Sequence, residues 1–459
     1  VFVASETFAS GPAGRATWVG TAKGVARRVA GSKREWLDPG TNLSGGVVRA
    51  VLLDRENNIW TGTSAGLDRF RSSRFVPLLE VRNNMSPVVS AADNGAIWLG
   101  TRESPLLSLS GKGIQAHGGR RYTLTLAPSR DGAMWVNDGD ALWHLKAGKF
   151  TKIPLVESIA QSPLMSIAEA ADGTLYATFN RSPILKWAAN NWEKLPPAPL
   201  AGVETALAVL SDSEGRLWAG YTGDRIGVRK GTENRTYSAK DGVRLGITLV
   251  ITEEAGRIWA AGSSGLVTFT GTGFQRIEAA EHGILRGISG LVGASNGDLW
   301  ANAASGVIRL PAGELRKALA DRTHRVKTQS FDHRDGVFGL PEQLVRRPTA
   351  ARDGNGLLWF ATSGGVFWTD PNRVEKNAIQ PIVRVLEMKA DEAVLPLTAP
   401  VQLPARMHKA EIRFGAVSLA QPERLTYQYR LNGVESEWSQ PDTRTSAIYT
   451  DLNPGGYGF

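Results

Sequence analysis

The sequence of 459 residues contains no cysteine, which excludes disulfide frameworks, thiolate zinc sites and cysteine nucleophiles. It also lacks a run of about 18 consecutive apolar residues, the length that a membrane helix requires. The first residues, VFVASETFASGP, show neither the charged nor the apolar region of a signal peptide, and the first residue is valine. We therefore interpret the sequence as a fragment or a processed product.

Positively charged residues outnumber negatively charged ones, but they are not clustered. Lys and Arg total 53 against 44 Asp and Glu, a formal net charge of +9. No run of five or six basic residues occurs, and the basic residues are not interleaved with aromatic ones as on nucleic-acid-binding surfaces. A solvated basic surface is expected, and no nucleic acid is expected to bind.

Motifs for catalysis and for cofactors are absent. The six histidines form no H-x-H or H-E-x-x-H pattern, and no G-x-S-x-G elbow, Walker loop or dinucleotide fingerprint is found. Glu253 and Glu254 are adjacent on an extended chain, where neighbouring side chains point in opposite directions, so they make a poor catalytic pair. We predict no cofactor, no metal and no catalytic residue. An enzyme assembled from residues far apart in sequence stays open as an alternative.

A repeated motif is the strongest signal in the sequence. The stretch IWTGTSAGLDRF returns eight more times in variants such as AIWLGTRESPLLSL and LWFATSGGVFWT. The aromatic anchors of these nine copies are spaced by 37 to 42 residues, except for a last interval of 59; they are Trp18, Trp60, Trp98, Trp135, Tyr176, Trp218, Trp259, Trp300 and Trp359. A period near 40 residues is typical of propeller blades or of helix pairs.

The local pattern favours the propeller. Short runs rich in Val, Ile, Leu and aromatic residues alternate with glycine turns, and helical spacing is missing. The copy at Trp60 predicts four strands, VVRAVLLD, NIWTGT, LDRF and RFVPLL. We expect the tryptophan to fill the space between neighbouring blades and the glycine two residues later to leave room for the neighbour.

Aspartates recur between the first and second predicted strands, at Asp93, Asp131, Asp172 and Asp212. A carboxylate at this place caps the backbone two residues further on. Because no D-x-D-x-D series is present, we interpret these aspartates as turn residues and not as calcium ligands.

The end of the sequence follows a different pattern. PAGELRKALADR, residues 311–322, predicts a short helix with proline at its start. After FWTDPNRV the period is lost, and PIVRVLEMKA, AEIRFGAVSL, LTYQYRL, SAIYTDL and GGYGF predict the strands of a sandwich. The boundary is predicted near Glu375 to Pro381.

These residues carry a resemblance to a known family. DRENNIWTGTSAGL resembles the two-component regulator propeller repeat, and FDHRDGVFGLP with WFATSGGVFWTDPNRV resembles the family's final blade. YQYRLNGVESEWSQPDTRTSAIYTDLNPGGYGF resembles the three-tyrosine (Y_Y_Y) module that follows such propellers in bacterial sensors, with Tyr427 or Tyr429, Tyr449, Tyr457 and Trp438 at the matching positions. Aromatic side chains on sandwich strands are mostly core residues, so these tyrosines are left out of the predicted site.

An all-β fold follows from the repeat and the resemblance together. Residues 86–376 are predicted to form a seven-bladed β-propeller, and residues 1–85 two further blades that end a truncated upstream ring. Residues 381–459 are predicted to form an immunoglobulin-like β-sandwich, the three-tyrosine module, which is C-terminally truncated. The family commonly carries 14 blades in two rings, whereas nine copies fit neither one ring nor two.

The resemblance implies the extracytoplasmic, periplasmic sensor region of a membrane-bound two-component protein, usually a sensor histidine kinase. This chain is then not itself an enzyme, and segments outside it tether the protein to the inner membrane. Oligosaccharides or other small molecules are the implied ligands, and the full-length protein is expected to be a homodimer. A propeller enzyme of the lyase or hydrolase type, or a secreted scaffold, is the alternative.

Departures from the repeat locate a candidate binding site. Five copies have small turns between the second and third strands, such as TSAG and GSSG, but four consecutive copies have TRESP, NDGDA, FNRSP and YTGDR. Charged turns are commonly only solvated, yet arginines and an aromatic side chain on four adjacent blades suit a planar or hydroxylated ligand. The candidate residues, called the rim residues below, are Arg102, Glu103, Asp138, Asp140, Asn180, Arg181, Tyr221, Asp224 and Arg225.

Overall fold

The computed structural model describes the chain except for residues 1–7, 12–15, 30–34, 38–42, 72, 82–86, 112, 119–121, 156–158, 160–161, 197–204, 344–347, 375–380, 399 and 420–421. It divides into two compact units, a central unit, Ser73–Val374, and a terminal unit, Val1–Ser72 with Glu375–Phe459. The linker predicted at residues 375–381 lies, apart from Pro381, outside the described residues.

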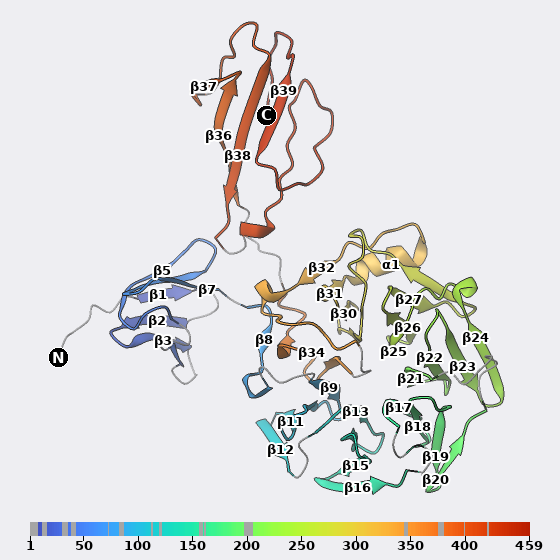
Figure 1. The fold of residues 1–459 in the computed structure, drawn as a ribbon. Helices are drawn as coiled ribbons and strands as arrows, with labels where there is room; N and C mark the ends of the chain where they lie inside the picture. Colours follow the sequence, from blue (N-terminus) through green and yellow to red (C-terminus); the bar gives the residue numbers. More distant parts are fainter. Residues whose placement is uncertain are drawn as a thin grey trace. The chain divides into compact units, whose positions relative to one another are not determined.

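Four-stranded antiparallel sheets, seven in the described part of the chain, build the central unit (Figure 1). The strands of the first four sheets are β9 (Val88–Ala91), β10 (Ile97–Gly100), β11 (Leu106–Ser110), β12 (Gly113–His117), β13 (Thr125–Pro128), β14 (Met134–Asn137), β15 (Leu142–Lys146), β16 (Lys149–Ile153), β17 (Leu164–Glu169), β18 (Leu175–Phe179), β19 (Leu185–Ala188), β20 (Asn191–Lys194), β21 (Ala208–Ser211), β22 (Leu217–Gly220), β23 (Ile226–Lys230) and β24 (Glu233–Tyr237). The strands of the last three are β25 (Thr248–Glu254), β26 (Arg257–Gly262), β27 (Leu266–Phe269), β28 (Phe274–Ile277), β29 (Gly290–Gly293), β30 (Leu299–Ala303), β31 (Gly306–Leu310), β32 (Gln329–Phe331), β33 (Ala350–Arg352), β34 (Leu358–Thr362), β35 (Gly365–Thr369) and β8 (Val76–Pro77).

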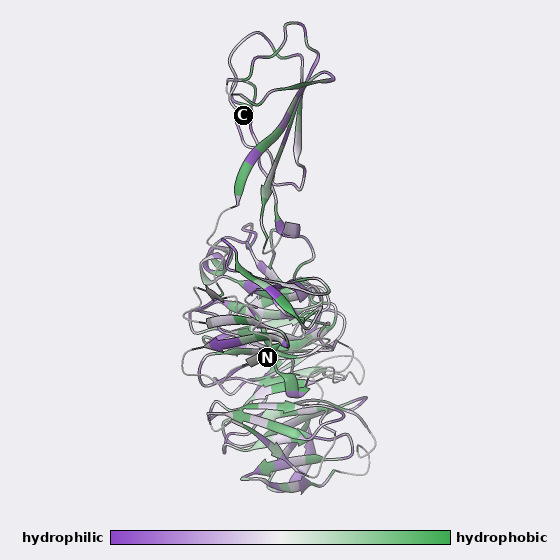
Figure 2. Ribbon diagram, turned by 90° about the vertical axis from the view of Figure 1, so that its left-hand side faces the viewer, coloured by the Kyte–Doolittle hydropathy of each residue, from purple (hydrophilic) through white to green (hydrophobic). Residues whose placement is uncertain are grey.

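The seven sheets follow one another around a common centre. The first strand of each sheet contacts the first strand of the next, from β9 and β13 through to β29 and β33, and β33 contacts β9. Each repeat copy from Trp98 onward therefore corresponds to one blade-like sheet, as the period predicted. Figure 2 shows hydrophobic residues on many strands of these sheets, and the buried core clusters join residues of neighbouring sheets.

The outer strand of the last sheet comes from the start of the unit and corrects one prediction. RFVPLL was expected to be the fourth strand of the Trp60 copy, but its strand β8 pairs with β35, Val76 opposite Trp368. Phe75 is fully buried between Trp300 and Phe360. An apolar run predicts a strand but does not predict which strand it pairs with. Here the burial of the Phe75 ring against the last two sheets favours the pairing of β8 with β35.

The anchor tryptophans pack between sheets, as the motif predicted. Trp218 is fully buried, and its ring lies 4.9 Å from that of Phe269 in the next sheet. A Cβ at Gly220, two residues later, would lie 2.4 Å from the Thr248 side chain of that sheet. The glycine is therefore required by the close approach of the neighbour.

Helix is limited to short segments among the described residues. The α-helix α1 (Ala312–Ala320) lies inside the predicted segment 311–322, between β31 and β32. The 3₁₀ turns are η1 (Leu79–Val81), η3 (Ala239–Asp241), η4 (His333–Asp335) and η5 (Pro422–Arg424). In the described part of the chain, no helix has the length and apolarity needed to cross a membrane.

Three sheets are described in the terminal unit. Their strands are β1 (Phe8–Gly11), β2 (Ala16–Thr21), β3 (Gly24–Val29) and β4 (Glu35–Leu37), then β5 (Val48–Leu53), β6 (Ile59–Thr63) and β7 (Leu67–Phe70), then β36 (Ile382–Ala390), β37 (Ala393–Leu395), β38 (Lys409–Val417) and β39 (Ser446–Thr450). The first two sheets share a core that includes Val25, Val48 and Ile59. They correspond to the copies at Trp18 and Trp60.

The third sheet has the order β37-β36-β38-β39, and its buried face is lined by Phe414 and Tyr449. The segments LTYQYRL and GGYGF, predicted as strands, form only isolated bridges, Tyr427 with Asp442 and Asn432 with Gly458. Aromatic alternation predicted strands there, but the side chains reach the core from an irregular backbone. The tyrosines are core residues, as expected.

Candidate ligand-binding surface

The rim residues lie where the sequence analysis placed them, between the second and third strands of four consecutive sheets. These turns join β10 to β11, β14 to β15, β18 to β19 and β22 to β23. The Asn180 amide donates a hydrogen bond to the Pro163 carbonyl, and the Asp224 amide donates one to the Gly246 carbonyl. Pro163 and Gly246 both belong to segments that lead into the first strand of a sheet. The turns and the connections between sheets therefore share one face.

A threonine that follows the W-x-G sequence shapes the first of these turns. The Thr101 hydroxyl accepts hydrogen bonds from the amides of Glu103 (3.2 Å) and Ser104 (2.8 Å). This threonine is buried, whereas Arg102 and Glu103 are exposed. The local cap thus holds the turn while both charged side chains face solvent.

Asp138 occupies the position of that threonine in its own copy. Its carboxylate accepts the amides of Asp140 (3.1 Å) and Ala141 (2.9 Å), and the side chain is buried. Its observed role is to cap the turn, and Asp140 is the exposed acid.

Tyr221 also stands at the threonine position, and its side chain is buried in a core with Ala206 and Val209. In the same turn the Asp224 carboxylate accepts the Gly246 amide at 2.6 Å, and the Arg225 guanidinium donates to the Thr222 carbonyl at 3.3 Å. This turn is therefore tied to its surroundings more tightly than the other three.

The remaining turn carries Asn180 and Arg181, both exposed. Arg181 has a positive φ of 56°, and its amide bonds to the Thr205 hydroxyl at 2.8 Å. The exposed rim residues are therefore Arg102, Glu103, Asp140, Asn180 and Arg181. Such a set offers guanidinium donors and carboxylate or amide acceptors to a hydroxylated or acidic ligand.

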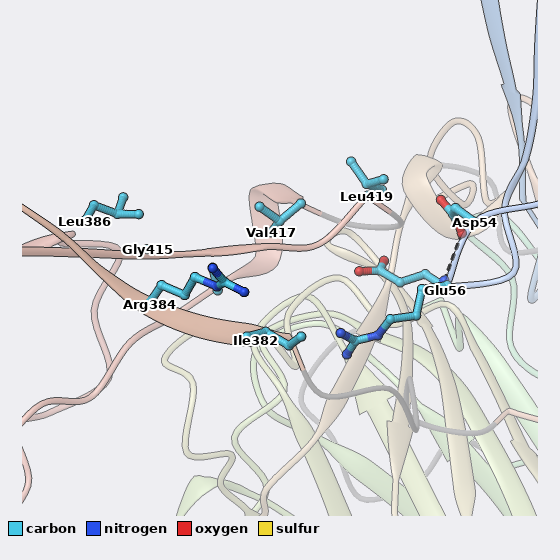
Figure 3. A pocket seen from close by; sticks show the side chains of 10 residues that line it. Asp54, Glu56, Ile382, Arg384, Leu386, Gly415, Val417 and Leu419 are labelled. Carbon is cyan, nitrogen blue, oxygen red and sulfur yellow. Dashed lines mark hydrogen bonds between the residues drawn. The ribbon is translucent and has the colours of Figure 1, made fainter.

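A pocket of about 370 Å³ lies in the terminal unit (Figure 3). Arg384 and Glu56 enter it from opposite sides, with Ile382 and Val417 between them. The Ser418 hydroxyl donates to the Glu56 carboxylate at 3.0 Å, so the blade that contains β6 is joined directly to the sheet that contains β38. No rim residue lines this pocket.

Hydroxyl groups of the tyrosines are bonded inside their own sheet region. Tyr449 donates to the Glu435 carboxylate at 3.1 Å and Tyr457 to the Asn453 carbonyl at 2.6 Å. Burial, together with the charge of Glu435, raises the pKa of Tyr449. Both hydroxyl groups are therefore satisfied by partners within this sheet region.

Among the residues that the structure describes, no group of three or more His, Asp or Glu side chains is arranged to hold a metal ion. Three of the four predicted turn caps are seen: Asp131, Asp172 and Asp212 each accept the amide two residues on. At the fourth turn Asn94 accepts the Ala96 amide in place of the predicted Asp93, because Asn94 is the residue directly before the turn glycine, as Asp131 and Asp172 are in their copies.

Residues 418–459 match the family model of the Y_Y_Y domain. The Y_Y_Y match covers the segment in which Tyr427, Tyr429, Tyr449 and Tyr457 gather around Phe414. The resemblance noted for this part of the sequence is thereby confirmed.

Solved structures with a similar fold cover nearly the whole chain. One is the extracellular domain of BT3049 from B. thetaiotaomicron, assigned as a hybrid two-component system, with a TM-score of 0.75, 19% identity, and coverage of 96% of this chain and 63% of that one. Another is the extracellular domain of BT4673 from B. thetaiotaomicron, assigned as a one-component system, with a TM-score of 0.50, 14% identity, and coverage of 98% and 66%. The chain thus spans less than two thirds of the length of the BT3049 domain. No curated protein sequence matches it significantly.

Sequence reasoning missed the threonine of the repeat. Its hydroxyl caps the second turn at Thr21, Thr63, Thr101 and Thr362. Comparison of the six copies that lack the W-x-G-T sequence would have marked Asp138 and Tyr221 as substitutes at a structural position.

Proposed function

We propose that this chain is the ligand-binding part of an extracytoplasmic sensor region in a membrane-bound two-component signalling protein, with a histidine kinase as its output. The observation that carries the proposal is the order of parts: repeated blades followed by a Y_Y_Y domain, in a fold similar over 96% of the chain to an extracellular domain of a two-component system. The periplasm is the proposed compartment.

The proposed architecture is a closed seven-bladed propeller at residues 86–376 with two further blades in residues 1–85 and an immunoglobulin-like sandwich at 381–459. Contact of β33 with β9 supports closure, as does the pairing of β8 with β35. Joining the first and last segments in one sheet is a common way to fix a propeller ring. Residues 76–77 then belong to the last blade although they precede the first.

The rim is the proposed ligand site. Arg102, Glu103, Asp140, Asn180 and Arg181 are exposed, and Asp224 and Arg225 are half-buried beside them. Asp138 and Tyr221 contribute by fixing their turns. The ligand class that fits is a hydroxylated molecule with an acidic group, such as an acidic oligosaccharide, because arginine pairs with carboxylates and the turns supply further polar groups.

Signalling requires that ligand binding differ in free energy between two arrangements of the protein. The proposed arrangements differ in the orientation of the Y_Y_Y region or in the dimerisation of two chains. Catalysis is not needed for this role.

A binding screen tests the proposal. Purified chain is titrated with acidic and neutral glycan fragments by calorimetry, and each mixture is afterwards analysed by mass spectrometry. Saturable binding with unchanged ligand supports a sensor. Turnover of a fragment would instead support the alternative, a propeller enzyme, and binding of none of the fragments would contradict the proposed ligand class.

A further inference from the structure

A second cavity, of about 400 Å³, lies in the central unit at the end of the strands opposite to the rim. It is lined by the turn from β25 to β26, the turn from β29 to β30, the end of β33, and α1. In an antiparallel meander the first-to-second and second-to-third turns lie at opposite ends of the strands. No rim residue takes part.

The cavity owes its shape to α1, which is inserted between β31 and β32. The Asp298 carboxylate accepts the Ala312 amide at the start of the helix (2.8 Å) and pairs with Arg309 (2.6 Å). In the same first turn of the helix, the Glu314 carboxylate accepts hydrogen bonds from the Lys327 amide (3.0 Å) and from the His324 ring (2.9 Å). The first turn of the helix is therefore tied both to the turn between β29 and β30 and to the segment that follows the helix.

The floor of the cavity is apolar. Trp259, Leu299 and Leu315 are buried, and Leu319 is packed against the same core. An apolar ring or chain of a ligand would lose contact with water on this surface, which is the ordinary source of affinity in small-molecule sites.

Charge in the cavity is predominantly positive. Arg257, Arg316 and Arg352 line it, against Glu254 and Asp298, and Asp298 is already neutralised by Arg309. Arg352 donates to the Gly293 carbonyl at 2.7 Å. Within the described residues, neither Arg257 nor Arg316 forms an ion pair or a side-chain hydrogen bond.

Glu254 is the remaining acid, and it is held against Gly293. A Cβ at Gly293 would lie 2.4 Å from a carboxylate oxygen of Glu254, so the carboxylate lies directly against the glycine. Burial raises the pKa of Glu254, although the Gly293 amide and Arg352 act in the opposite direction. With Asp298 paired to Arg309, the cavity is lined by one further carboxylate, that of Glu254, and by the guanidinium groups of Arg257, Arg316 and Arg352. Positive charge is therefore in excess there.

We infer that this cavity binds a small organic anion, with its apolar part on Trp259, Leu315 and Leu319 and its acidic group among Arg257, Arg316 and Arg352. Its volume lies in the range of ligand sites, roughly 300 to 1,000 Å³. The site goes beyond the proposed sensor function and does not depend on it, because the rim uses other residues at the other end of the strands.

Phenyl phosphate is a suitable probe because it joins an apolar ring to a compact anion. It is titrated into the full chain and followed by calorimetry and ligand-observed NMR, with phenol and inorganic phosphate as partial probes. The expected result is saturable binding of phenyl phosphate that is tighter than that of either partial probe. No saturable binding at millimolar concentration would overturn the proposal.

Variants locate the site. R257Q/R316Q is expected to raise the Kd for phenyl phosphate by at least about tenfold, because two guanidinium partners are lost. R322Q/R325Q makes the same change of net charge at exposed residues that do not line the cavity, and should leave the Kd unchanged. Equal weakening in both variants, or in neither, would contradict the site, and thermal melting verifies that each variant is folded.

Discussion

The indole of Trp218 donates a 2.7 Å hydrogen bond to the carboxylate of Asp212, six residues earlier in the chain. The same spacing joins Trp60 to Asp54 and Trp359 to Asp353. In these copies one carboxylate caps the first turn and also satisfies the buried N–H of the anchor, so the turn and the packing between sheets are fixed together.

Removal of that carboxylate should destabilise the central unit. Burial raises the pKa of Asp212, but the bonds from Trp218 and Arg216 outweigh it and hold the pKa below its usual range. Asp212→Ala leaves a buried indole N–H and two turn amides without an acceptor, at a cost of about 2 to 3 kcal/mol in the free energy of unfolding. Asp93→Ala, at an exposed residue of an equivalent turn, is the control and should cost less than about 0.5 kcal/mol. Urea unfolding measures both, and equal losses would contradict this role.

The glycine two residues after the anchor gives a second test. Gly220→Ala should destabilise by about 1 to 3 kcal/mol because its Cβ would lie 2.4 Å from Thr248 of the next sheet. Gly62 holds the same place in the Trp60 copy, but there the nearest atom to an added Cβ is 3.7 Å away. Gly62→Ala should therefore be tolerated. A Gly220→Ala protein as stable as its parent in chemical unfolding would show that the sheets are less closely packed than described.

The pairing of β8 with β35 predicts where the central unit begins. A fragment of residues 73–374 retains Phe75 and β8, whereas a fragment of residues 87–374 loses both. Since Phe75 is fully buried, its loss alone costs about 3 to 5 kcal/mol, and the shorter fragment should melt at a lower temperature or fail to fold. Calorimetric melting of the two fragments compares them. Equal melting temperatures would mean that β8 does not stabilise the central unit.

Glu314 predicts a pH effect on stability. Hydrogen bonds from Lys317, Lys327 and His324 lower its pKa to about 2. A lowered pKa means that the stabilisation is complete above the unfolded value of about 4.3 and is lost as the pH falls toward the folded value. Glu314→Gln should therefore lower Tm at pH 7, with a difference from the parent that shrinks between about pH 4 and pH 2. A difference that is constant over this pH range would show that the carboxylate charge does not matter.

The repeat made the blades predictable, because the spacing of the anchors and the turn residues are local signals. The sequence did not reveal the partner of β8, since RFVPLL is apolar enough to pair with either of two sheets. It also did not reveal that Asp138 and Tyr221 are buried, because a charged or aromatic residue in a turn was assumed to face solvent. The helix near Leu315 was predicted, but the cavity beside it depends on Glu254, Gly293 and Arg352, which meet only after the sheets have packed.

The central claim is that the rim binds a ligand, and calorimetry on a rim variant tests it most directly. Arg102→Ala, Arg181→Ala and Arg225→Ala are combined in one protein, with a matched triple variant at Arg130, Arg322 and Arg325, which are exposed and lie outside the rim. With any glycan fragment that binds the parent chain, the rim variant should lose binding by a factor of at least about 100, because three arginine contacts to the ligand are removed. Its Tm should stay close to that of the parent, because Arg102 and Arg181 are exposed and Arg225 is only half-buried. The control variant should bind like the parent. Undiminished binding by the rim variant, or equal loss in both variants, would contradict the claim.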